Sequence, residues 1–175
     1  MSKKILVIYK SVTGFTKEYA EWIAQETDAA LMDIKKATPK NMSDFDTIVF
    51  GGRMHAGTVD GLKTAKKLLG QSHASHFLIF ATGAMPNEAK ATIEEMWRNN
   101  LTSKELSELP HFYMQAGLRY ETMPFLDRMM IKAFRAMMRK KKEKTEADIQ
   151  MVQAIAGSYN ISSKEHIRPL IAALK

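Results

Sequence analysis

Short, unbroken apolar runs alternate along this sequence with longer stretches that have helical spacing. The apolar runs contain many β-branched and aromatic residues, which is typical of strands buried on both faces of a sheet. They cover residues 4–9, 30–34, 47–50, 76–81 and 112–116. The stretches between them repeat apolar residues every three or four positions, as amphipathic helices do. This alternation predicts an α/β fold with a parallel sheet, right-handed crossovers and helices on both faces.

Length and composition favour a single domain. The chain has 175 residues, and no linker, repeat or low-complexity tract divides it, so we expect one domain over residues 1–175. The absence of cysteine excludes a disulfide framework, thiol catalysis and cysteine-held metal clusters. The first apolar run is too short for a signal peptide or a membrane span. We therefore expect a cytoplasmic protein.

A loop rich in hydroxyl groups follows the first apolar run directly. It spans Ser11 to Thr16, reads Ser-Val-Thr-Gly-Phe-Thr, and leads into a stretch with helical spacing. Ligands of doubly wound sheets bind beyond the carboxyl ends of the strands, where a helix N-terminus offers unpaired N–H groups and positive potential. The three hydroxyls add donors, and Gly14 lets the backbone approach closely. The loop predicts a phosphate site, although an ordinary helix cap has a similar composition.

The motif Ser-x-Thr-Gly-x-Thr after an apolar first strand resembles the FMN-phosphate loop of flavodoxins. A Walker loop is excluded because no Gly-x4-Gly-Lys occurs, and the dinucleotide motif Gly-x-Gly-x-x-Gly is absent after the first strand. The resemblance implies a flavodoxin-like, doubly wound, five-stranded parallel sheet in the order 2-1-3-4-5, with FMN as cofactor. It implies that the cofactor is held by Ser11, Thr13, Gly14, Phe15 and Thr16.

Two further loops are expected where flavodoxin-like proteins hold the flavin ring, after the third and fourth predicted strands. The resemblance makes cofactor ligands of Gly52, Arg53, Met54, His55, Ala56 and Gly57 in the first loop and of Thr82, Gly83 and Ala84 in the second. Neither loop has the Trp or Tyr that flavodoxins usually stack on the ring, so Met54, His55 or Met85 would have to cover it. Two alternatives stay open: His55 as a solvated loop histidine, and Arg53 as a surface residue.

Nearly all of the positive charge lies in one segment after the fifth predicted strand. The formal net charge is +7, and residues 119–144 contribute +6 of it, with nine Lys or Arg against three acids. Residues 125–142 have helical spacing, which places Met, Phe and Leu on one face of the expected helix. The opposite face carries a basic stripe of Arg128, Lys132, Arg135 and Arg139. Such a helix suits an anionic membrane surface, and its Met-rich face suits a flat apolar substrate or partner. Alternatively, the apolar face packs on the domain itself and the stripe is simply solvated.

The same segment resembles a narrower family. Residues 116–120 (Ala-Gly-Leu-Arg-Tyr) and 127–132 (Asp-Arg-Met-Met-Ile-Lys) are similar to the short, flavodoxin-sized bacterial protoporphyrinogen oxidases that pass electrons to menaquinone. The resemblance implies an FMN-dependent enzyme that works at the membrane and carries a helical insertion after strand five, here at about 119–145. We accordingly assign Arg119, Tyr120 and the four residues of the basic stripe to substrate or partner binding.

These features favour an oxidoreductase that oxidises protoporphyrinogen or a similar reduced donor, with a quinone as acceptor. FMN would do the electron chemistry, and no side chain is assigned a catalytic role. One alternative is a flavodoxin-type electron shuttle, although shuttles usually present an acidic face. Another is a regulatory module without FMN, which the intact phosphate loop disfavours. We expect neither a metal nor a nucleic-acid partner, and a cytoplasmic location with peripheral attachment to the inner face of the membrane.

Overall fold

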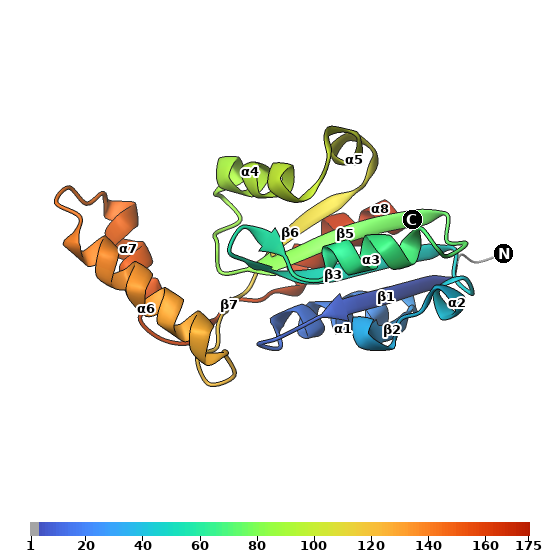
Figure 1. The fold of residues 1–175 in the computed structure, drawn as a ribbon, viewed down its shortest axis with the longest axis horizontal. Coiled ribbons are helices and arrows are strands. Elements are labelled where there is room, and N and C mark those ends of the chain that lie inside the picture. Colours follow the sequence, from blue (N-terminus) through green and yellow to red (C-terminus); the bar gives the residue numbers. More distant parts are fainter. Residues whose placement is uncertain (1–3) are drawn as a thin grey trace.

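A computed structural model describes residues 4–175 as a layered α/β fold (Figure 1). The strands of its central parallel sheet are β1 (Ile5–Lys10), β2 (Ala30–Asp33), β3 (Thr47–His55), β5 (His76–Gly83) and β6 (His111–Gln115). They lie in the order β2-β1-β3-β5-β6, and each pair of neighbours is parallel. Counted along the chain, this is the order 2-1-3-4-5, so the predicted doubly wound sheet is confirmed.

Helices cover both faces of the sheet. One face carries α1 (Phe15–Thr27) and the C-terminal η2 (Lys164–Ile167) and α8 (Arg168–Leu174), and the other carries α3 (Leu62–Leu69), α4 (Lys90–Asn100) and α5 (Ser103–Glu108). Alternate residues of β1 enter the two cores: Val7 packs on the α1 side, and Leu6 and Ile8 pack on the other. Because both faces of the strand are buried, its sequence is an unbroken apolar run.

Local capping sets two short helices that apolar spacing does not predict. The Thr102 hydroxyl accepts a hydrogen bond from the Glu105 N–H at 3.2 Å, and the Glu105 carboxylate accepts one from the Thr102 N–H at 2.8 Å, which starts α5. The Lys66 ammonium, 2.7 Å from this carboxylate, holds the pKa of Glu105 below its usual value. A similar box between Thr38 and Asn41 starts α2 (Pro39–Met42), which follows the short turn η1 (Ile34–Lys36).

The third strand is longer than the glycine pair after its apolar run predicts. The sequence indicates that the strand ends at Gly51 and Gly52. This is wrong, because β3 continues to His55 and pairs with β5 as far as Arg53. Close packing requires the glycines. A Cβ on Gly51 would lie 2.0 Å from the Phe80 ring, and one on Gly52 would lie 2.6 Å from the main-chain oxygen of Asp60. The stretch assigned to a flavin loop therefore begins as a strand.

The chain then turns in a tight hairpin beside the carboxyl edge of the sheet. Ala56 (φ 48°) and Gly57 (φ 79°) form the turn, and β4 (Thr58–Val59) pairs antiparallel with the end of β3. Asn100, at the end of α4, fixes the hairpin. Its Oδ1 accepts from the Val59 N–H and its Nδ2 donates to the Gly57 carbonyl, both at 2.8 Å.

The insertion after β6 forms a pair of helices that stands out to one side of the sheet domain (Figure 1). It contains α6 (Phe125–Lys140) and α7 (Glu146–Ala154), and an antiparallel ribbon of β7 (Gly117–Leu118) and β8 (Tyr159–Asn160) joins it to the domain. Every residue of α6 is at least partly exposed. In the described part of the chain, no helix is both long enough and apolar enough to cross a membrane.

The alternative in which the apolar face of α6 packs on the domain does not describe this helix, because most of that face is exposed. Six large apolar side chains, exposed by between 40% and 74%, form what we call the α6 apolar face: Phe125, Leu126, Met129, Met130, Phe134 and Met137. The basic stripe is divided. Lys132 and Arg139 are exposed, whereas Arg128 and Arg135 are half-buried. The stripe is therefore not one solvated surface.

Candidate functional site

The loop from Ser11 to Thr16 lies at the carboxyl end of β1 and leads into α1. The Ser11 hydroxyl accepts a hydrogen bond from the Gly14 N–H at 3.2 Å, and Gly14 has a φ of 95°, a conformation that favours glycine. No side chain of the described residues caps α1, so the N–H groups of its first turn have no side-chain acceptor. This arrangement lets a helix N-terminus bind an anionic group.

A buried pair of hydroxyls ties this loop to β5. Oγ1 of Thr16 and Oγ1 of Thr82 lie 2.8 Å apart, and both residues are 1% exposed. Each hydroxyl therefore has a partner within the protein, which fixes the start of α1 against the middle of the sheet. This contact holds the phosphate loop beside the end of β5.

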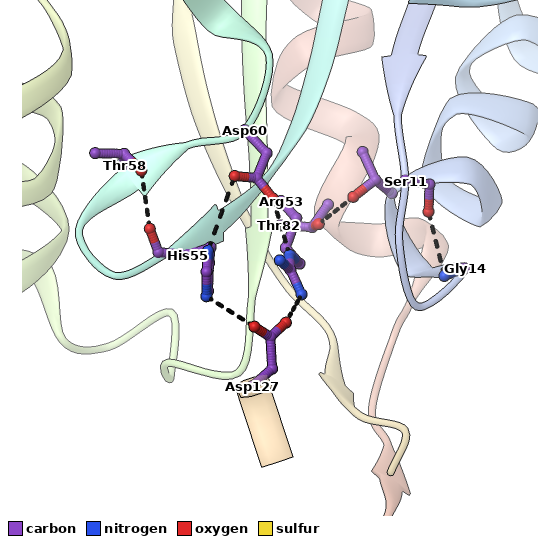
Figure 2. Close-up of polar contacts among 9 residues, drawn as sticks. Ser11, Gly14, Arg53, His55, Thr58, Asp60, Thr82 and Asp127 are labelled. Carbon is purple, nitrogen blue, oxygen red and sulfur yellow. Dashed lines mark hydrogen bonds and ion pairs between the residues drawn. The ribbon is translucent and has the colours of Figure 1, made fainter. Parts of the chain in front are cut away.

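Four polar side chains meet where β3 ends. Arg53 Nε lies 3.1 Å from Asp60 Oδ2, and Arg53 Nη1 lies 2.7 Å from Asp127 Oδ2. His55 Nε2 lies 3.2 Å from Asp127 Oδ1 without the alignment of a hydrogen bond, and its Nδ1 lies 4.0 Å from Asp60 Oδ1. Figure 2 shows Asp127, from the first turn of α6, pointing at both side chains of β3. Arg53 is thus paired twice and is not a free surface residue.

A cavity of about 130 Å³ lies between the phosphate loop, the ends of β3 and β5, the segment after β6, and α6. Eight of the predicted cofactor ligands line it: Thr13, Phe15, Arg53, Met54, His55, Thr82, Gly83 and Ala84. The opposite wall is largely apolar and includes Leu118, Met123, Met130 and Ile131. The structure therefore brings the two predicted ring segments and the phosphate loop to one cavity, which the insertion closes on the far side.

The loop after β5 is fixed by the edge strand β6. The Tyr113 hydroxyl donates to the Met85 carbonyl at 2.9 Å, and burial raises the pKa of Tyr113 well above its usual value. The Asn87 N–H donates to Gln115 Oε1 at 3.3 Å, and the Gln115 N–H donates to Asn87 Oδ1 at 3.1 Å. Met85 packs against the sheet core. Of the residues expected to cover the flavin ring, it is Met54 and His55 that line the cavity.

Several predicted site residues lie elsewhere. Gly52 is a buried strand residue, and Ala56 and Gly57 form the exposed tip of the hairpin. Tyr120 holds the insertion together, because its hydroxyl donates to the main-chain oxygen at Ile155, just after α7. By contrast, Arg119, assigned to substrate or partner binding, does line the cavity, beside the phosphate loop.

Sequence reasoning misses the acidic half of the charged network and the apolar wall. Asp127 is the only acid in α6 and lies in its first turn, which is a signal that could have indicated an anchor. Asp60 gives no comparable signal, because its role depends on the hairpin that brings it back to Arg53. Met123 and Ile131 line the cavity only because of where the insertion packs, and apolar spacing does not reveal that position.

The sequence profile of the flavodoxin domain matches residues 6–147, a range that includes the phosphate loop, both ring segments and α6. The chain belongs to the flavodoxin domain family. A search of curated proteins finds no match for this flavodoxin-domain protein. The profile identifies the domain, and the narrower resemblance to protoporphyrinogen oxidases remains a matter for proposal.

Solved structures similar to this flavodoxin-domain protein include flavodoxins and flavoproteins. A WrbA-like flavodoxin from Agrobacterium tumefaciens is 19% identical, with 72% of this chain and 88% of that chain covered and a TM-score of 0.42. A flavoprotein in complex with FMN from Lactobacillus acidophilus is 19% identical (65% and 93% covered, TM-score 0.40). Oxidised flavodoxin 1 from Bacillus cereus is 17% identical (87% and 96% covered, TM-score 0.40). The family assignment rests on the domain profile, not on these distant likenesses.

The site of this flavodoxin-domain protein fits FMN, the cofactor of the family. The uncapped start of α1 lies behind Gly14, where a side chain would intrude: its Cβ would lie 2.6 Å from Arg119 Nη1. The N–H groups of this loop, with Thr13, would hold the phosphate. The end of β3 and the start of the loop after β5 would hold the flavin ring beside the cavity.

Proposed function

We propose that this protein is an FMN-dependent oxidoreductase that oxidises protoporphyrinogen or a similar reduced donor and passes the electrons to a quinone. The observation that carries the proposal is the α6 apolar face. It is continuous with the flavin-ring cavity through Met130, which is 50% exposed and also lines the cavity. A large apolar molecule lying on this face would therefore reach the ring site.

Bound FMN would accept and release the electrons, and the protein would supply binding, orientation and exclusion of water. Leu118, Met123 and Ile131 make the far wall of the cavity apolar, which limits the access of water to the ring site. On the β3 side of the cavity, Arg53 is held between Asp60 and Asp127, so its guanidinium is fixed and its charge is compensated within this network.

The chemistry of the donor suits the charges that border the α6 apolar face. Protoporphyrinogen is a large, mostly apolar macrocycle, puckered at its methylene bridges, with propionate side chains. Lys132 and Arg139 are exposed at the border of the apolar face and are suited to carboxylates. A protein shuttle that presented this face to a partner would meet that partner with unpaired Met and Phe side chains instead of the usual acidic surface.

Stopped-flow mixing of the FMN-loaded protein with protoporphyrinogen under anaerobic conditions tests the proposal. We expect bleaching of the flavin absorbance, followed by recovery when a soluble menaquinone analogue is added. Met130→Glu should slow the bleaching strongly, whereas the matched control Met151→Glu, at a 45% exposed methionine of α7, should not. If the donor does not bleach the flavin but a flavodoxin reductase does, the protein is a shuttle and the proposal is wrong.

We further propose that α6 attaches the protein peripherally to an anionic membrane, where a quinone would be available. Support comes from the exposure of the α6 apolar face beside Lys132 and Arg139. Each basic residue at an anionic surface contributes about 1 kcal/mol, so replacing both by glutamine should weaken vesicle binding by about thirtyfold at low salt. Lys63→Gln with Lys67→Gln, on the exposed side of α3, is the matched control. Wild-type protein that stays in the supernatant with phosphatidylglycerol vesicles at low salt would contradict attachment.

A further inference from the structure

Arg119 reaches back from the start of the insertion onto the phosphate loop. Its Nη1 donates to the Thr13 carbonyl at 3.2 Å and lies 2.6 Å from where a Cβ on Gly14 would be. Its Cζ lies 4.0 Å from the centre of the Phe15 ring. Thr122 adds a second contact from the same segment, because its hydroxyl donates to the Thr13 carbonyl at 3.4 Å. The root of the insertion is therefore packed on the loop that the sequence assigns to phosphate.

The position of Arg119 is unusual for a cation. It lies beside the N-terminus of α1, where the helix dipole is positive and opposes a positive charge. One carboxylate compensates it: Glu18 Oε2, in the first turn of α1, lies 3.1 Å from Arg119 Nη2, and the two side chains are 28% and 32% exposed. A guanidinium has five N–H groups, and within residues 4–175 Arg119 donates through two nitrogens, to Thr13 and to Glu18. Donors remain for an anion at the loop.

The other cation of the cavity is already paired. Arg53 lies within 3.1 Å of Asp60 and 2.7 Å of Asp127, and the side chains of this triplet are no more than 18% exposed. The loop itself contains no Lys or Arg. A phosphate carries about 1.5 to 2 negative charges at neutral pH, so its binding at the loop calls for a cation that the loop lacks. Among the cavity residues, Arg119 is the one placed to supply it.

We propose that Arg119 pairs with the phosphate of FMN, so that the insertion, and not the loop alone, selects FMN over riboflavin. The inference rests on the proposed FMN site. It links the cofactor to the insertion, because the residue that would pair with the phosphate belongs to the segment that leads into α6. Glu18 acts as the alternative partner of the guanidinium when no phosphate is bound.

Fluorescence titration of the apo-protein with FMN and, separately, with riboflavin tests this pairing. A hydrogen bond to a charged group contributes about 1.5–3 kcal/mol, so we expect Arg119→Gln to weaken FMN binding by roughly 10- to 100-fold and to leave riboflavin binding within about twofold. Arg119→Lys should fall between the two, because it keeps the charge and loses the planar fork. Arg168→Gln is the matched control, since it removes an exposed arginine paired with Glu165 and should change neither affinity.

Each outcome decides for or against the pairing. Equal weakening of FMN and riboflavin by Arg119→Gln would show that Arg119 only shapes the loop, and unchanged FMN affinity would show no role. If Arg119→Gln fails to fold, Glu18→Gln decides: freeing the guanidinium should keep or tighten FMN binding, whereas a purely structural ion pair predicts weaker binding of both flavins. Wild-type protein that binds riboflavin as well as FMN refutes the pairing, and wild-type protein that binds neither refutes the flavin site itself.

Discussion

Replacing Asp127 by asparagine removes the charge that joins α6 to the end of β3. Asp127 is 13% exposed and lies 2.7 Å from Arg53 and 3.2 Å from His55. A buried ion pair that loses one partner costs about 3–5 kcal/mol, and an exposed pair contributes about 0–1 kcal/mol. Arg53 keeps Asp60 at 3.1 Å, so its charge is not left unpaired. We therefore expect the free energy of unfolding to fall by about 1–2 kcal/mol, between the two limits.

The assay is urea unfolding followed by circular dichroism, with limited trypsin digestion beside it. Trypsin reports on the insertion, because the connection between α6 and α7 contains Lys141, Lys142 and Lys144. The matched control is Glu94→Gln, whose 3.4 Å pair with Arg98 is about two-thirds exposed and should contribute about 0.5 kcal/mol or less. Asp127→Asn should speed cleavage in the connection, and Glu94→Gln should not.

The reasoning is refuted if the two variants behave alike. An Asp127→Asn protein with the unfolding midpoint of Glu94→Gln and the wild-type cleavage pattern would mean that the network does not hold α6 in place. The apolar wall of the cavity would then have no fixed position, and the assignment of Met130 and Ile131 to that wall would lose its basis.

Three further changes test the packing around the site. Thr82→Val should lower the free energy of unfolding by about 1–3 kcal/mol because it leaves the buried Thr16 hydroxyl without its partner. In a double-mutant cycle measured by urea unfolding, the double change Thr16→Val/Thr82→Val should cost less than the sum of the two single changes. Gly51→Ala should cost about 1–3 kcal/mol, because its Cβ would lie 2.0 Å from the Phe80 ring, and a thermal melt measures this. Because the pKa of Tyr113 is raised, the contribution of its neutral hydroxyl to stability is complete below about pH 10, the ordinary tyrosine pKa, and is lost as the pH rises above it. Between about pH 8 and pH 11, the unfolding midpoint of Tyr113→Phe should therefore fall less steeply than that of the wild-type protein.

Sequence alone predicts the sheet and the phosphate loop because both depend on local chemistry. Leu6, Val7 and Ile8 are all apolar, and a short strand with no polar face must be buried on both sides, which a parallel sheet with two helical layers provides. The loop between Ser11 and Thr16 follows that strand directly, so its place at the carboxyl edge of the sheet is fixed by chain order.

Other parts of the site depend on contacts between distant residues. A glycine in the sequence is compatible both with a turn and with a close-packed strand. At Gly51 it is the close approach of the Phe80 ring, on the neighbouring strand, that requires glycine, and the sequence does not reveal this contact. Apolar spacing gives α6 two faces but does not say which one turns inward, so the half-burial of Arg128 was not predictable. Arg119 is 106 residues from Thr13 in the sequence, and only the fold brings them together.

The central claim is that the loop from Ser11 to Thr16 holds the phosphate of FMN, and the most direct test compares FMN with riboflavin on the wild-type apo-protein. The two flavins differ only in the phosphate, so any difference in Kd measures what the phosphate site contributes, from the loop and from Arg119 together. One hydrogen bond to a charged group is worth about 1.5–3 kcal/mol, so we expect FMN to bind at least tenfold more tightly than riboflavin. Equal dissociation constants for the two flavins would contradict the claim.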